Sequence, residues 1–131
     1  MHYKPYPLPN PFLEYIGAEF IHADNTKCVL QIDITEKLMN SWGSGHGGML
    51  VTLMDVSMSW ASRFYLNEPK GAVTLELKSS FFASAHGLVT CIGKVIHKTS
   101  TLAFCEAEVT NQNSELVCKA SATFKYINNL L

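Results

Sequence analysis

One acidic residue lies where the sequence around it is otherwise apolar. Asp55 falls in the middle of a long, nearly uninterrupted apolar segment from Gly48 to Tyr65. Burying an unpaired carboxylate costs free energy, and Asp is a mediocre helix former, so stability alone would favour another residue there. A carboxylate in such a place can act as a nucleophile or as a general base for water. In the structural alternative, Asp55 bonds to Thr52, Ser59 or a turn at a subunit contact.

A cluster of glycines surrounds His46 directly before this segment, at positions 43, 45, 47 and 48. A glycine-rich turn that leads into a helix leaves unpaired N–H groups and a positive dipole end, which can hold an anion or a developing oxyanion. The cluster contains a literal GxGxxG, but no βαβ alternation follows it, so we reject a dinucleotide site. No Gly-Lys-Ser/Thr closes it, which excludes a P-loop more firmly.

The spacing of these two features predicts a dimer. Gly47 and Asp55 are eight residues apart, which is about 12 Å along a helix at ~1.5 Å per residue. A carbonyl group polarised by the Gly47 N–H therefore lies beyond the reach of the same chain's Asp55. Two antiparallel helices in a dimer would bring each helix N-terminus to the partner's carboxylate.

The composition agrees with an oligomer and excludes several partners. The chain has 131 residues, enough for one domain covering residues 1–131. Charged residues make up only 16%, against about 25% in an average soluble domain, which is little for the surface of a monomer. The 10 basic and 11 acidic residues form no long run of either sign. We therefore expect no nucleic acid and no membrane as partner.

Periodicity predicts the elements that position these residues. Residues 1–16 indicate an extended lead-in with a short helical turn, and alternation from Thr26 to Thr35 predicts a strand that pairs with Gly17–Ala23. The apolar segment predicts one buried helix. Four further strands are expected at Ala72–Phe82, Leu88–His97, Thr101–Val109 and Glu115–Ile127. Short connections indicate an antiparallel meander, with the lone helix buried against an α+β sheet. In the last strand, Leu116, Cys118, Ala120, Ala122, Phe124 and Tyr126 should share one face.

Other chemistry-bearing residues favour simpler interpretations. Cys28, Cys91, Cys105 and Cys118 form no CxxC pair and lie among apolar residues, so we expect them in the core of a reduced, cytoplasmic protein. The start of the chain resembles no signal peptide, which agrees with that location. The histidines show no metal-ligand spacing, and we expect no metal site.

The order of these motifs resembles a known family. Asn40, His46-Gly47-Gly48 and Thr52-Leu53-Met54-Asp55 follow one another as turn, glycine corner and buried helix. This pattern is similar to that of the hotdog-fold acyl-CoA thioesterases of the phenylacetate-degradation (PaaI) type. The likeness extends over roughly residues 12–127, because the order of strands and helix is also the hotdog order. It implies an antiparallel sheet of about five to six strands wrapped around one long central helix.

The resemblance also implies roles for the glycine corner. The backbone N–H of Gly47 would polarise the thioester carbonyl. His46 and Asn40 would shape that corner, and Gly48 would contribute to substrate binding.

The resemblance implies the attacking groups as well. Asp55 of the neighbouring subunit would be the nucleophile or the general base, and Thr74 would supply a hydroxyl that positions the water. Hydrolysis of an activated thioester needs an oxyanion donor and a base or nucleophile. We therefore expect no metal and no cofactor, because CoA is part of the substrate.

The leading hypothesis is hydrolysis of acyl-CoA by a homodimer or homotetramer, with the acyl group left open. One alternative is a hotdog enoyl-CoA hydratase or dehydratase, although His46 and Asp55 match its spacing poorly. The other is a non-catalytic acyl-CoA binding or sensing protein.

Overall fold

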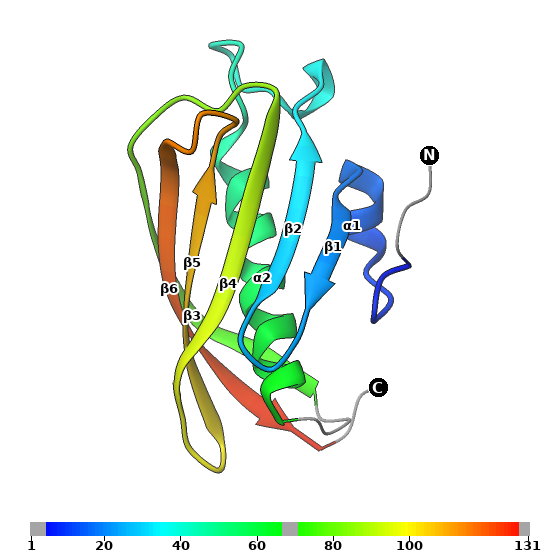
Figure 1. The fold of residues 1–131 in the computed structure, drawn as a ribbon, viewed down its shortest axis with the longest axis vertical. Coiled ribbons are helices and arrows are strands. Elements are labelled where there is room, and N and C mark those ends of the chain that lie inside the picture. The colour runs from blue at the N-terminus through cyan, green and yellow to red at the C-terminus, as the bar shows by residue number, and fades with distance from the viewer. Residues whose placement is uncertain (1–4, 67–70, 129–131) are drawn as a thin grey trace.

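A curved antiparallel sheet of six strands wraps around one long helix (Figure 1). The computed structural model describes residues 5–66 and 71–128. The helices are α1 (Pro11–Ile16) and α2 (Gly47–Leu66), with a short 3-10 turn at Glu36–Leu38. The strands are β1 (Glu19–Ala23), β2 (Cys28–Asp33), β3 (Gly71–Phe81), β4 (Leu88–Lys98), β5 (Leu102–Thr110) and β6 (Leu116–Ile127). The expected α+β sheet around a central helix is confirmed.

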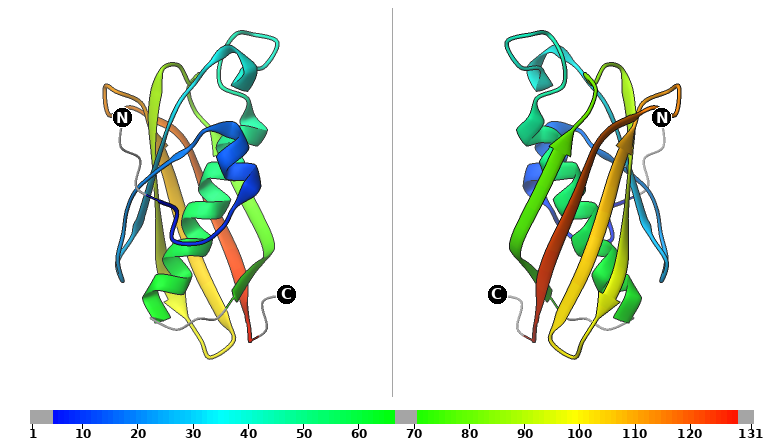
Figure 2. Two further views of the ribbon diagram at one scale, coloured as in Figure 1. Left: turned by 90° about the vertical axis from the view of Figure 1, so that its right-hand side faces the viewer. Right: turned by 90° about the vertical axis from the view of Figure 1, so that its left-hand side faces the viewer.

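Local signals in the sequence explain where α1 begins and ends. The Asn10 side chain accepts a hydrogen bond from the Leu13 N–H at 3.0 Å, and Pro11 occupies the first helical position. Gly17 ends the helix with a left-handed φ of 82°, and its N–H donates to the Glu14 carbonyl. The helix lies beside α2 (Figure 2).

A close approach between α2 and β4 fixes the helix on the sheet. A Cβ on Gly93 would lie 2.6 Å from the carbonyl carbon of Ser57, so only glycine allows this contact. The buried Ser57 hydroxyl donates to the Met54 carbonyl at 3.0 Å and lies 3.2 Å from the Cys91 sulfur. The helix backbone therefore packs directly on the strand.

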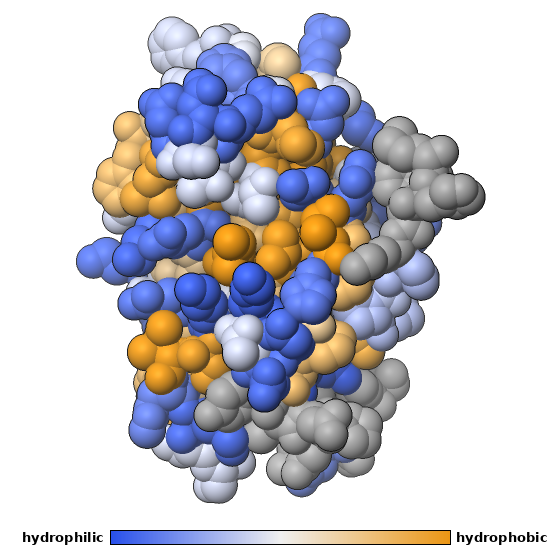
Figure 3. Space-filling model, in the orientation of Figure 1, coloured by the Kyte–Doolittle hydropathy of each residue, from blue (hydrophilic) through white to orange (hydrophobic). Residues whose placement is uncertain are grey.

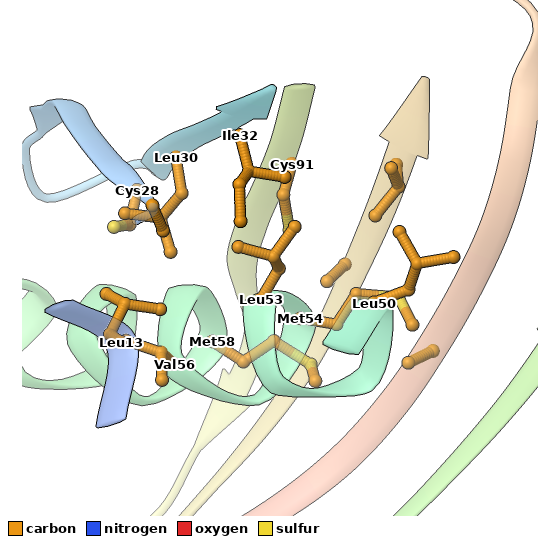
Figure 4. Close-up of a cluster of buried hydrophobic side chains, with 14 of the residues drawn as sticks. Leu13, Cys28, Leu30, Ile32, Leu50, Leu53, Met54, Val56, Met58 and Cys91 are labelled. Atoms are coloured by element: carbon orange, nitrogen blue, oxygen red, sulfur yellow. The ribbon is translucent and has the colours of Figure 1, made fainter. Parts of the chain in front are cut away.

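The core fills the space between α2 and the concave face of the sheet (Figure 4). Leu53, Met54 and Met58 are fully enclosed there. All four cysteines are free and buried, as expected. Desolvation by burial raises the pKa of each thiol to about 12. They act as small apolar side chains in the core.

The strand order differs from the expected meander. It is β1-β2-β4-β5-β6-β3, so β4, β5 and β6 form a meander but β3 pairs with β6. Strand β4 has β2 on one side and β5 on the other, which leaves no edge for β3. Strand β3, which follows α2 in the sequence, lies at the edge of the sheet opposite β1 (Figure 1). As a result, β3 is an 11-residue strand with one unpaired side.

The expected alternation in β6 holds from Cys118 onward and fails before it. Val117 and Cys118 are both buried, whereas Leu116 is 37% exposed. The pairing with β5 shifts register between Val109 and Thr110, opposite this point. The irregularity turns Leu116 out of the core.

The outer face of the sheet is mixed in polarity. Figure 3 shows hydrophilic side chains interspersed with separate apolar patches over the strands that face the viewer. Among the described residues, no helix is long and apolar enough to cross a membrane.

Candidate functional site

The N-terminus of α2 presents two backbone donors that the described part of the chain leaves unused, the N–H groups of Gly47 and Met49, of which Met49 is buried and Gly47 is partly exposed. The N–H groups of Gly45 and His46 donate to the carbonyls of Ala85 and Leu38, each at 2.8 Å. The Gly48 N–H donates to the Nδ1 atom of His46 at 2.9 Å. For the Gly47 N–H, at the first position of the helix, the described residues provide no acceptor. The Gly47 N–H is therefore a free hydrogen-bond donor at the positive end of the dipole of a 20-residue helix.

His46 caps the helix through its ring. Its carbonyl accepts the N–H of Leu50 at 3.1 Å, which places His46 at the cap position. Because Nδ1 accepts the Gly48 N–H, the neutral ring carries its proton on Nε2. A Cβ at position 48 would lie 3.1 Å from this ring, so Gly48 gives the ring room to cap.

Asn40 organises the loop that leads to this corner. Its Oδ1 accepts the N–H groups of Trp42 at 2.9 Å and Ser44 at 3.2 Å, and its Nδ2 lies 3.1 Å from Ser44 Oγ. The Asn40 N–H also donates to the Ser44 carbonyl at 2.8 Å. Each of these bonds lies within the loop from 40 to 44, so Asn40 acts on the glycine corner through the backbone.

Asp55 and Thr74 meet on the same chain. The Thr74 hydroxyl on β3 donates to Asp55 Oδ1 at 2.6 Å. The sequence predicts a buried carboxylate, but Asp55 is only half-buried in the single protomer. It points towards β3, the edge of the sheet, where no other strand in the described part of the chain covers it. The carboxylate therefore has one fixed partner and an open side.

Strand β3 passes both halves of the site in turn. Asp55 contacts Thr74 near the start of β3, whereas an added Cβ on Gly47 would meet the ring of Phe81 at 3.5 Å, at its end. The strand thus runs antiparallel to α2. The free donor and the carboxylate lie at opposite ends of one exposed edge.

A pocket of about 440 Å³ opens beside the glycine corner. Phe12, Tyr15 and Ile16 of α1 form one side of it, and His46 and Gly48 belong to its wall. Lys37, Leu38, Met39 and Met49 complete the lining. Sequence reasoning missed this pocket, because its residues come from three segments whose contact no local pattern reveals. In the described ranges, no three His, Cys, Asp or Glu side chains cluster as metal ligands would.

Comparison with known proteins identifies the class. A model of the thioesterase superfamily matches residues 43–118, which include the glycine corner, Asp55 and Thr74. The chain belongs to the thioesterase superfamily, and its architecture is the hotdog fold.

Individual relatives agree with this assignment. The chain is 29% identical over 111 residues to 1,4-dihydroxy-2-naphthoyl-CoA hydrolase of Listeria monocytogenes, covering 84% of this chain and 90% of that protein. A conserved protein of Pseudomonas aeruginosa, PA5202, superposes with a TM-score of 0.86 at 29% identity, over 91% of this chain and 95% of that one. The Escherichia coli PaaI protein superposes with a TM-score of 0.83 at 20% identity, over 92% and 86% of the two chains. At that identity, the likeness to PaaI concerns the fold alone.

Proposed function

We propose that this protein hydrolyses acyl-CoA thioesters as a PaaI-type enzyme, working as a homodimer or a dimer of dimers. One observation carries the proposal: a free N–H of Gly47 at a helix N-terminus, with the Asp55–Thr74 pair two turns further along the same helix. The CoA-ester specificity named for the Listeria relative supports the substrate class. Four free thiols agree with a reducing compartment such as the cytoplasm.

The groups at the two ends of β3 have different roles in the proposed reaction. The Gly47 N–H and the helix dipole stabilise negative charge on the carbonyl oxygen as the tetrahedral species forms. Asp55 of the partner subunit attacks the carbonyl carbon or takes a proton from the attacking water. The Thr74 hydroxyl holds that carboxylate in place. The C–S bond breaks, CoA leaves as its thiol, and water supplies the acid's oxygen, so no metal or cofactor is needed.

The open edge of β3 provides the dimer contact. Val73, Leu75 and Phe81 are exposed apolar side chains on this strand. An unpaired 11-residue strand is a template for pairing with another chain. Antiparallel pairing of two β3 strands about a two-fold axis brings the Asp55–Thr74 end of one protomer towards the Phe81–Gly47 end of the other. This arrangement overcomes the helix spacing that separates Gly47 from its own Asp55.

The first experiment measures free thiol released from a panel of short, long and aromatic acyl-CoA esters. Asp55→Asn should keep the fold and lower kcat about 100-fold or more, as removal of a general base or nucleophile does. Asp33→Asn, at an exposed position at the end of β2, is the matched control and should retain full activity. Undiminished turnover in Asp55→Asn would contradict the assignment. Binding of esters by the wild type without any thiol release would favour an acyl-CoA sensor.

A further inference from the structure

The pocket lined by His46 and Gly48 lies next to the proposed carbonyl site. Gly47 provides the free N–H, and the next residue, Gly48, forms part of the pocket wall together with His46. If the Gly47 N–H holds the thioester carbonyl, one of the two groups attached to that carbonyl carbon can enter this pocket. That group is either the acyl chain or the pantetheine arm of CoA.

We propose that this pocket binds the acyl chain, and that Lys37 at its rim makes it selective for chains that end in a carboxylate. The inference rests on the proposed hydrolase activity and deepens it by naming a substrate class. The pantetheine arm of CoA is the competing occupant.

The lining favours an apolar chain over the pantetheine arm. Phe12, Ile16, Leu38, Met39 and Met49 present mainly hydrocarbon surface, and two of them are methionines, which adapt to irregular ligands. Pantetheine carries two amides, and each would lose hydrogen bonds to water in such a lining. A volume of about 440 Å³ lies within the range typical of small-molecule sites.

Lys37 gives the rim a positive charge without a compensating acid. Its Nζ donates to the Tyr15 carbonyl at 3.3 Å and lies 5.5 Å from the centre of the Tyr15 ring. No Asp or Glu belongs to the pocket lining. Among residues 5–66 and 71–128, Lys37 forms no ion pair with a carboxylate. An apolar pocket with an unpaired cation at its mouth suits a ligand with an apolar body and an anionic end.

The residues that form this pocket lie largely outside the part of the chain that the family model matches. Phe12, Tyr15, Ile16 and Lys37 precede residue 43, where that match begins. The glycine corner and Asp55 lie inside it. The proposed catalytic residues therefore lie in the segment shared with the family, whereas the proposed preference for one kind of acyl chain depends on α1 and the 3-10 turn.

Two esters of equal chain length test the role of Lys37. Hexanoyl-CoA and adipoyl-CoA differ only in a terminal methyl or carboxylate. Lys37→Met should lower the ratio of kcat/KM for adipoyl-CoA over hexanoyl-CoA about fivefold, because the ion pair at a solvent-exposed rim is modest. Lys94→Met, which removes an exposed lysine from β4, should leave the ratio unchanged.

A second variant tests which substituent occupies the pocket. Phe12→Ala should lower kcat/KM several-fold more for hexanoyl-CoA than for acetyl-CoA, whose acyl group is too short to fill the pocket, and inhibition by free CoA should stay as in the wild type. If it weakens inhibition by free CoA and slows all esters equally, the pocket holds pantetheine and the inference is wrong. An unchanged adipoyl-to-hexanoyl ratio in Lys37→Met would also overturn it.

A binding measurement separates this inference from the proposed function. Calorimetric titration of both esters into Asp55→Asn, with and without Lys37→Met, needs no turnover. A wild type that hydrolyses no ester of the short, long and aromatic panel contradicts the hydrolase. If adding Lys37→Met to Asp55→Asn removes the preference for binding adipoyl-CoA over hexanoyl-CoA, the Lys37 site is supported even without turnover. If adipoyl-CoA binds equally well with and without Lys37, the Lys37 site is refuted.

Discussion

At the scale of single residues, two adjacent backbone N–H groups in the glycine corner have different roles. The Gly48 N–H is taken up by the His46 ring, whereas the Gly47 N–H stays free. His46 thus secures the helix start without occupying the Gly47 N–H, the donor proposed for the substrate carbonyl. This division predicts that His46 contributes to stability through its cap.

His46→Ala should lower the free energy of unfolding by about 1 kcal/mol, the usual loss when a side-chain cap is removed. His46→Asn should recover most of it, because Asn is among the best capping residues. Urea denaturation of the three proteins measures the difference. Equal stability of His46→Ala and wild type would show that the ring does not support the helix in solution.

The chemistry-bearing residues could be predicted from sequence because their spacing is local. Gly47 and Asp55 lie on one helix, and an acidic residue in an apolar run is visible without a structure. The exposure of Asp55 could not be predicted in this way. It depends on β3, which lies at the sheet edge and leaves one side of the carboxylate open.

At the scale of elements, alternation and turn residues located each strand and the long helix to within a few residues. The position of β3 next to β6 escaped prediction, because pairing partners far apart in sequence leave no local pattern. The pocket escaped for the same reason: α1 and the turn at Glu36–Leu38 meet only in the folded chain. The exposed edge of β3 is the element on which the proposed dimer depends.

Leu75→Lys should convert the dimer to monomers and abolish most thiol release. Leu75 is 55% exposed on the unpaired edge, where a lysine places charge in the proposed contact. Ile96→Lys is a matched control. Ile96 is an apolar β4 residue that is 58% exposed, and, like Leu75 on β3, it lies where the pairing with the neighbouring strand shifts register. Sedimentation velocity gives the oligomeric state of both. A dimeric, active Leu75→Lys protein would place the subunit contact elsewhere.

At the scale of the whole molecule, each proposed site takes its donor from one protomer and its carboxylate from the other. Two inactive variants can therefore restore one another. Gly47→Pro removes the N–H while keeping the helix, because proline is favoured at the first helical position. Asp55→Asn removes the carboxylate.

Co-folding the two variants in equal amounts should restore about a quarter of wild-type activity. Random pairing makes half of the dimers mixed, and one of the two sites in each mixed dimer combines an intact Gly47 with an intact Asp55. Each variant alone should remain inactive. A mixture as inactive as its components would indicate that the site lies within a single chain.

The buried thiols make stability fall at alkaline pH. The native pKa of all four is raised to about 12 from an ordinary value of 9.0, so between these values the unfolded chain loses protons that the native chain keeps. The free energy of unfolding should therefore decrease as pH rises above about 9. Urea denaturation at pH 7, 8 and 10 measures it, and native thiols should resist a thiol reagent at pH 8. Rapid labelling of the native protein at pH 8 would contradict their burial.

The unpaired edge of β3 has a consequence for how turnover responds to dilution. In the proposed dimer, each site is complete only when two β3 edges meet, so an isolated protomer would hold the parts of a site but no working one. Below the dissociation constant of the dimer, the rate per volume rises with the square of protein concentration. The amount of protein in a compartment then acts as a regulator of its own specific activity, without any effector molecule.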